Sequence, residues 1–66
     1  MKNTVRVERA ILDITQQQLA DAIGVSRNTI NSIESGQYVP STVLALNIAR
    51  HFVKPGDSIF QLDEND

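Results

Sequence analysis

The chain has 66 residues with a formal net charge of −2, and it contains no cysteine. This length accommodates a single domain, and the lack of cysteine excludes disulfides, thiolate metal sites and thiol nucleophiles. No apolar run is long enough to span a bilayer and the N-terminus does not have the layout of a signal peptide, so we expect a cytoplasmic protein without a membrane partner. A core this small leaves little net stability, which favours dimerisation.

The distribution of charge reduces the conflict between an acidic chain and a nucleic-acid partner. Residues 1–54 contain all six lysines and arginines against four acidic residues, a balance of +2. The acidic residues beyond them are Asp57, Asp63, Glu64 and Asp66. Because the local field at a binding face matters more than total charge, DNA stays a possible partner. So few cations predict weak non-specific binding and a shallow dependence on salt.

A first helix is predicted over residues 4–12. Four apolar residues recur at helical spacing and are expected to face the core: Val7, Ala10, Ile11 and Ile14. Residues 4–7 also alternate as a strand does, so the start of this helix stays open.

A second helix is predicted over residues 16–23. Thr15 can cap it through its hydroxyl. Its inward positions are Leu19, Ala20 and Ile23. The small side chain of Ala20 allows a neighbouring helix to cross closely, and Gly24 supplies the left-handed residue that ends the helix.

A third helix follows after a tight turn. Ser26 can cap it, Ile30 and Ile33 form its buried side, and Gly36 ends it, so we place it over residues 27–35. The joint spacing of these two helices and their turn is typical of a helix-turn-helix. That motif lays its second helix in the major groove of DNA.

The last third predicts a loop over residues 37–40 and one more helix, capped by Ser41 and stopped by Pro55 and Gly56. The apolar stripe of this helix consists of Leu44, Ala45, Ile48, Ala49 and Phe52. A short turn or strand over residues 58–62 follows, and residues 63–66 form an acidic tail that we expect to be flexible. The expected fold is an all-α domain of four or five helices, with a possible short C-terminal strand.

The outer face of the third helix carries the candidate base contacts. With Ile30 and Ile33 turned inward, the polar residues left outside are Arg27, Asn28, Asn31, Ser32 and Ser35. Arginine can pair with guanine and asparagine with adenine, each through two hydrogen bonds. The residues alone leave this interpretation level with the alternative that an exposed helix face is simply polar.

The start of the second helix offers a place for a phosphate, because its free N–H groups and dipole favour an anion near Gln16 and Gln17. The alternative is that Thr15 only caps the helix. Arg9 and Glu34 form a candidate ion pair if the first helix packs across the next two; otherwise they are unrelated surface charges.

No arrangement of residues indicates catalysis. His51 has no acidic neighbour in sequence, and the serines lack the strand-turn-helix context of a nucleophile. We therefore expect no enzyme activity, no metal, no cofactor and no small-molecule ligand.

The segment that carries the strongest resemblance is TQQQLADAIGVSRNTINSIESGQYVPS. It resembles the Cro/CI-type (XRE) helix-turn-helix family, and the similarity extends over residues 3–62. The ending Ile59-Phe60-Gln61 is similar to that of short stand-alone regulators. The resemblance implies a lambda-repressor-like domain that binds a palindromic operator as a homodimer, more often as a repressor than as an activator.

The resemblance also implies roles for single positions. It places base contacts at Arg27, Asn28, Asn31 and Ser32. It places contacts with the DNA backbone at Gln16, Ser35 and Gln37, and we add Thr15, Gln17 and Ser26 as further candidate phosphate contacts. It makes Arg9 and Glu34 a buried ion pair. Our candidates for the dimer interface are Pro55, Ile59, Phe60 and Leu62.

Several residues depart from the family pattern. Glu8 stands where an apolar residue is usual, while Ile11 and Leu12 stand where charges are usual, so the first helix is either rotated or exposes apolar surface to a partner. Val53 replaces a common glycine and Gly56 a common aliphatic residue, which leaves the last connection open. A protein-interaction module, such as an antitoxin or a phage adaptor, is the competing function, and it would use Phe60 and Leu62.

Overall fold

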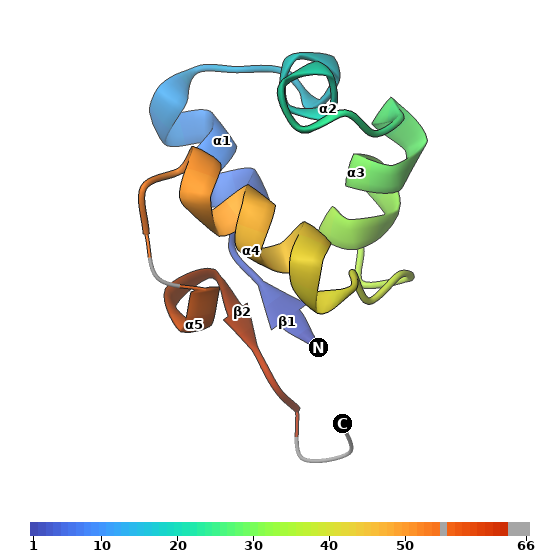
Figure 1. Ribbon diagram of the computed structural model, residues 1–66, viewed down its shortest axis with the longest axis vertical. Helices are drawn as coiled ribbons and strands as arrows, with labels where there is room; N and C mark the ends of the chain where they lie inside the picture. The colour runs from blue at the N-terminus through green and yellow to red at the C-terminus, as the bar shows by residue number, and fades with distance from the viewer. Residues whose placement is uncertain (55, 64–66) are drawn as a thin grey trace.

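The computed structural model describes residues 1–54 and 56–63, which form five short helices and one small sheet (Figure 1). Pro55 and residues 64–66 lie outside the described residues. In chain order the elements are β1 (Lys2–Asn3), α1 (Val5–Leu12), α2 (Gln16–Ile23), α3 (Arg27–Glu34), α4 (Thr42–His51), α5 (Gly56–Ile59) and β2 (Phe60–Gln61). The predicted all-α class is confirmed. No helix within the described ranges has both the length and the apolar character needed to cross a membrane.

The two helices of the predicted motif form as their end signals require. The Thr15 hydroxyl accepts a hydrogen bond from the Gln18 N–H, and the Gln18 side chain accepts one from the Thr15 N–H, which is a capping box. Ser26 caps α3 in the same way, by accepting from the Thr29 N–H. Gly24, at φ 77°, is the left-handed residue between them.

The core lies where α2, α3 and α4 meet α5 and the start of α1. Its largest fully buried side chains are Val5, Leu19, Ile30, Ile33, Ile48 and Ile59. Ala20 is also fully buried. The predicted inward positions of α3 are therefore confirmed. Four of the five residues predicted for the later stripe, Leu44, Ile48, Ala49 and Phe52, lie in or against the core, whereas Ala45 lines a surface groove.

The predicted inward face of α1 is wrong for three of its four residues, whereas Ile14, just beyond the end of the helix, is partly buried against the core. Val7 and Ile11 are 57% and 69% exposed, and Ala10 is exposed as well, whereas Val5 and Glu8 are the buried residues of this helix. The buried Glu8 carboxylate is compensated by the Lys54 ammonium, whose Nζ lies 2.5 Å from Oε1. Because Lys54 lies 46 residues from Glu8 in the sequence, the apolar spacing within the helix does not reveal that Glu8 is on the buried face.

The connection after α4 also differs from the prediction. The helix ends at His51, before Pro55, and Gly56 begins α5 instead of stopping α4. Val53 takes the left-handed backbone at φ 56°, a strained conformation for a β-branched residue. Its N–H donates to the Arg50 carbonyl at 3.0 Å, which closes the helix end without a glycine.

A two-stranded antiparallel sheet joins the two ends of the described chain (Figure 1). Lys2 lies opposite Gln61 and Asn3 lies opposite Phe60. Of residues 4–7, where the alternation left a strand open, Thr4 is the N-cap residue of α1 and residues 5–7 lie in that helix, and the strand precedes them. The possible C-terminal strand forms, with β1 as its partner.

Candidate nucleic-acid interface

The outer face of α3 presents the predicted polar side chains to solvent. Arg27, Asn28 and Asn31 are exposed, and Ser32 is half-buried. They lie outside because Ile30 and Ile33 are anchored in the core on the opposite side of the helix. Side chains that donate and accept hydrogen bonds thus stand together on one exposed helical surface, which suits the edges of bases in a major groove.

Arg27 differs from the other cations of the chain. All six lysines and arginines belong to the described residues, and five of them make hydrogen bonds or ion pairs there: Lys2, Arg6, Arg9, Arg50 and Lys54. Arg27 makes none among residues 1–54 and 56–63. Its five N–H donors are therefore available to a ligand, in the first turn of the helix that the motif places in the groove.

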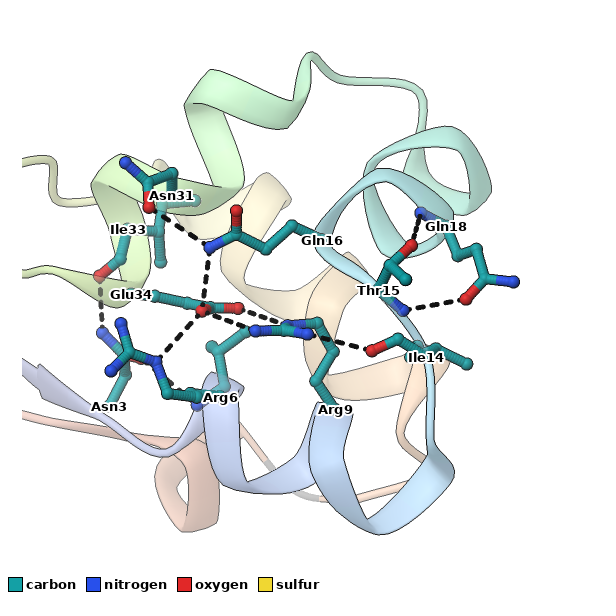
Figure 2. A network of polar contacts seen from close by, with 11 residues as sticks. Asn3, Arg6, Arg9, Ile14, Thr15, Gln16, Gln18, Asn31, Ile33 and Glu34 are labelled. Carbon is teal, nitrogen blue, oxygen red and sulfur yellow. Dashed lines mark hydrogen bonds and ion pairs between the residues drawn. The ribbon is translucent and has the colours of Figure 1, made fainter.

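Beneath this face, a polar network joins α1, α2 and α3 (Figure 2). The Glu34 carboxylate is 0% exposed and accepts from Arg9 Nε at 2.7 Å and Arg9 Nη2 at 3.1 Å. Arg9 Nη1 also donates to the Ile14 carbonyl at 2.9 Å. Arg6, which is mostly exposed, lies 3.5 Å from the same carboxylate. The ion pair between Arg9 and Glu34 is therefore present, and it joins α1 to α3.

The network changes the acid–base properties of both partners. Burial alone would raise the pKa of Glu34, but hydrogen bonds from Arg9 and Gln16 and the charge of Arg9 together hold that pKa below its ordinary value. The hydrogen bond to Glu34 raises the pKa of Arg9, against the opposing effect of burial. Both groups stay charged at neutral pH.

Gln16 links the start of α2 to the exposed face of α3 (Figure 2). Its Nε2 donates to Glu34 Oε1 and to Asn31 Oδ1, both at 3.2 Å. A hollow at this end of α2 is lined by Thr15, Gln16, Gln17 and Arg27 together with Arg9, Asp13 and Ile14. The N-terminal end of α2 and the Arg27 guanidinium, which has no partner among the described residues, thus border one surface depression.

Three of the four remaining predicted phosphate contacts, Gln17, Ser26 and Ser35, have side-chain partners within the chain. Gln17 Nε2 donates to Asp21 at 2.8 Å, and Ser35 Oγ donates to the Ser32 carbonyl at 3.1 Å. The Ser26 hydroxyl bonds with that of Thr29 at 2.9 Å. Gln37 is exposed. These bonds lie at the surface, where exchange for a phosphate contact costs little.

Tyr38, an exposed aromatic side chain beside this face, is not among the site residues predicted from the sequence. Tyr38 is 46% exposed and lines a hollow with Asn28, Thr29 and Ser32. It follows the third helix in the loop, and an exposed aromatic directly after a polar helix face is the signal that could have found it.

A second surface, the α4–β2 groove, is mostly apolar. Its lining consists of Met1, Val39, Pro40, Thr42, Ala45, Leu46, Gly56, Asp57, Phe60 and Leu62. Phe60 and Leu62 thus lie where a partner can reach them. Ile59 does not: it is 0% exposed within one chain, so its place in the predicted dimer interface is corrected to the core. Pro55 falls outside the described residues.

Comparison with known proteins agrees with the geometry. A helix-turn-helix family model matches residues 5–56. An uncharacterized HTH-type transcriptional regulator of Bacillus subtilis is 42% identical over 97% of each chain. Similar regulators from Methanocaldococcus jannaschii and Methanothermobacter thermautotrophicus are also 42% identical, over 100% and 98% of this chain and 100% and 96% of their own.

The matched region runs from the first residue of α1 to the first residue of α5, so it contains the polar face of α3 and the network beneath it. The region matched by this chain covers nearly the whole length of these relatives, so the similarity is not confined to the helix-turn-helix motif. The family consists of DNA-binding regulators and not of enzymes. This chain belongs to the Cro/CI-type (XRE) helix-turn-helix family of transcriptional regulators.

Proposed function

We propose that the protein is a homodimeric repressor that binds a palindromic operator and reads its sequence through α3. The observation that carries this proposal is the exposed polar face of α3 with Arg27, which makes no hydrogen bond or ion pair within residues 1–54 and 56–63. Arg27 is suited to both acceptors of a guanine, and Asn28 to an adenine. Asn31 and Ser32, one turn further on, complete the base-reading set.

The phosphate contacts of the proposal surround this face. They comprise Thr15, Gln16, Gln17, Ser26, Ser35 and Gln37. Gln16 has a double role, because the side chain that reaches the phosphate also bonds Asn31 and Glu34 and so fixes α3 relative to the DNA backbone. With the other five cations engaged within the chain, the salt dependence of binding is expected to be shallow.

The second copy is proposed to pack on the α4–β2 groove. A twofold interface uses the same patch on both chains, so it needs a projection and a hollow side by side. Leu62 is 79% exposed and Leu46 56% exposed at the groove, beside the small residues Ala45 and Gly56. The dimer would present two copies of α3 about 34 Å apart, one turn of duplex. Occupation of a promoter then excludes polymerase, and repression requires no other surface.

Selection of double-stranded sites from random DNA, followed by sequencing, tests this function directly. We expect an enriched palindrome with half-site centres about one helical turn apart. Arg27→Ala should weaken binding to that operator by about 1–3 kcal/mol and relax specificity at one base of each half-site. Arg50→Ala removes the same charge from α4 and is the matched control, with only a small uniform loss expected. Equal losses for both variants would refute the base contact of Arg27.

A protein-interaction module is the second candidate, favoured by the exposed apolar side chains of α1. Val7, Ile11 and Leu12 are each at least half exposed, and apolar surface of this kind marks protein contacts. Failure of the folded protein to enrich any DNA site would favour this candidate. Such a module would tolerate Arg27→Ala and depend on its apolar surfaces.

A further inference from the structure

Asn3 lies in the terminal sheet, yet its side chain reaches the recognition helix. Its Nδ2 donates to the carbonyl oxygen of Ile33 in α3 at 2.8 Å (Figure 2). Its Oδ1 accepts from the Val5 N–H at 3.2 Å. One half-buried amide therefore uses both ends, and the two bonds fix its orientation because a flipped amide would satisfy neither.

The second of these bonds also explains how α1 begins. Thr4 is the N-cap residue of α1, but its side chain makes no capping hydrogen bond. Asn3 supplies the acceptor from one residue earlier, in an Asx turn. The side chain that starts α1 is thus the same one that holds the last turn of α3.

The backbone of Asn3 connects this contact to the groove. Asn3 pairs with Phe60 across the sheet, and Phe60 lines the α4–β2 groove. The Thr4 N–H donates to the Ile59 carbonyl at 2.9 Å, which ties the same segment to the end of α5. A short path of one strand pair and one side-chain hydrogen bond therefore runs from the groove to the C-terminal end of α3.

The C-terminal half of α3 is held by side chains from two different parts of the chain. Gln16 of α2 bonds Asn31 and Glu34 on one side, within the helix-turn-helix itself. Asn3 is the side chain that bonds α3 to the terminal sheet. Because the groove is the proposed dimer surface, the bond from Asn3 relates the direction of α3 to the partner chain, whereas the bonds from Gln16 do not.

We propose that Asn3 is a positioning residue that fixes α3 relative to the dimer surface and so sets the half-site spacing that the dimer accepts. This inference rests on the proposed homodimeric operator binding. It assigns Asn3 no contact with DNA. The preference for half-site bases stays with the outer face of α3, and only the tolerance for their separation depends on Asn3.

The test compares two variants on operators whose half-sites are moved apart or together by one base pair. Asn3→Asp keeps the oxygen that accepts from Val5 but replaces the donor by a carboxylate that faces the Ile33 carbonyl. Lys54→Met is the matched control, because it breaks the pair with Glu8 in α1 and has no bond to α3. We expect Asn3→Asp to reduce the preference for the best spacing about fivefold, the effect of one lost hydrogen bond. The half-site consensus should not change, and Lys54→Met should keep the parental preference.

Amide hydrogen exchange gives a second readout without DNA. The Gly36 N–H donates to the Ile33 carbonyl and the Gln37 N–H to the Ser32 carbonyl, so both report on the end of α3. Exchange at these amides should accelerate in Asn3→Asp, while that of Val25, at the end of α2, should not. A purely structural role would accelerate all three together.

The outcomes separate this inference from the function on which it rests. An unchanged spacing preference in Asn3→Asp, or an equal loss in Lys54→Met, overturns the positioning role. If the parent protein selects no operator, the proposed function fails and the exchange data decide the role of Asn3. Faster exchange confined to Gly36 and Gln37 supports positioning, and uniform acceleration or no acceleration overturns it.

Discussion

The helix-turn-helix and the helix that precedes it place their apolar side chains in opposite ways. In α2 and α3 the apolar residues Leu19, Ala20, Ile30 and Ile33 are buried and the outer face is polar, although the Glu34 carboxylate is also buried, against Arg9. In α1 a carboxylate is buried at Glu8, while apolar side chains stand outside. The helix-turn-helix therefore exposes a polar surface to solvent, whereas α1 exposes apolar side chains.

This contrast indicates two kinds of partner for two surfaces. A polar face with free donors and acceptors favours a hydrogen-bonding ligand such as DNA. Exposed apolar side chains favour a protein. The contrast also predicts where single substitutions will be costly, because a buried charge that loses its partner destabilises more than an apolar side chain at the surface.

The largest effect is expected where the two regions meet, at Arg9. Arg9→Met removes the main partner of the fully buried Glu34 carboxylate. The free energy of unfolding should fall by about 3–5 kcal/mol, measured by urea denaturation at neutral pH. A loss of this size approaches the whole stability of a small domain.

Arg6→Met is the matched control for that experiment. Arg6 faces the same carboxylate at 3.5 Å but is 70% exposed, so its loss should cost less than about 1 kcal/mol. If Arg9→Met leaves the chain unfolded, adding Glu34→Leu should restore part of its stability by removing the unpaired charge. Equal losses for Arg9→Met and Arg6→Met would contradict the special role of the buried pair.

The helix-turn-helix could be predicted closely because its boundaries depend on local chemistry. Thr15 and Ser26 cap the helices that follow them, and Gly24 takes the left-handed backbone between. Once Ile30 and Ile33 are turned inward, the exposed face of α3 follows from helical geometry. These relations span a few residues, so they are readable in the sequence.

The rest of the chain depends on contacts between distant residues. The burial of Glu8 requires Lys54, and the end of α3 is held by Asn3. Sequence spacing does not reveal such pairs, so the inward face of α1 was predicted wrongly. The candidate site shows the same limit: Arg27 is distinguished by its lack of a partner among the described residues, and this is known only once the partners of the other cations are known.

An effect of intermediate size is expected from a matched pair of variants that compares the apolar surface of the α4–β2 groove with that of α1. Leu46→Glu places a charge in the α4–β2 groove and should weaken dimerisation by about 2 kcal/mol, measured by sedimentation equilibrium. Ile11→Glu places the same charge on α1, at a side chain that is 69% exposed, and should leave the dimer intact. Dissociation by Ile11→Glu and not by Leu46→Glu would move the interface to α1.

The smallest expected effect is on the stability of the protein at acid pH. Because the pKa of Glu34 lies below its ordinary value of 4.5 in the folded chain, its contribution to stability is complete above that pH. Below it, the unfolded chain binds a proton that the folded chain does not, so stability falls until the pH reaches the lowered pKa. Urea denaturation between pH 3 and 7 should therefore show a shallower acid dependence for Glu34→Gln than for the parent. An identical dependence would mean that the network joining the two regions does not hold the carboxylate ionised.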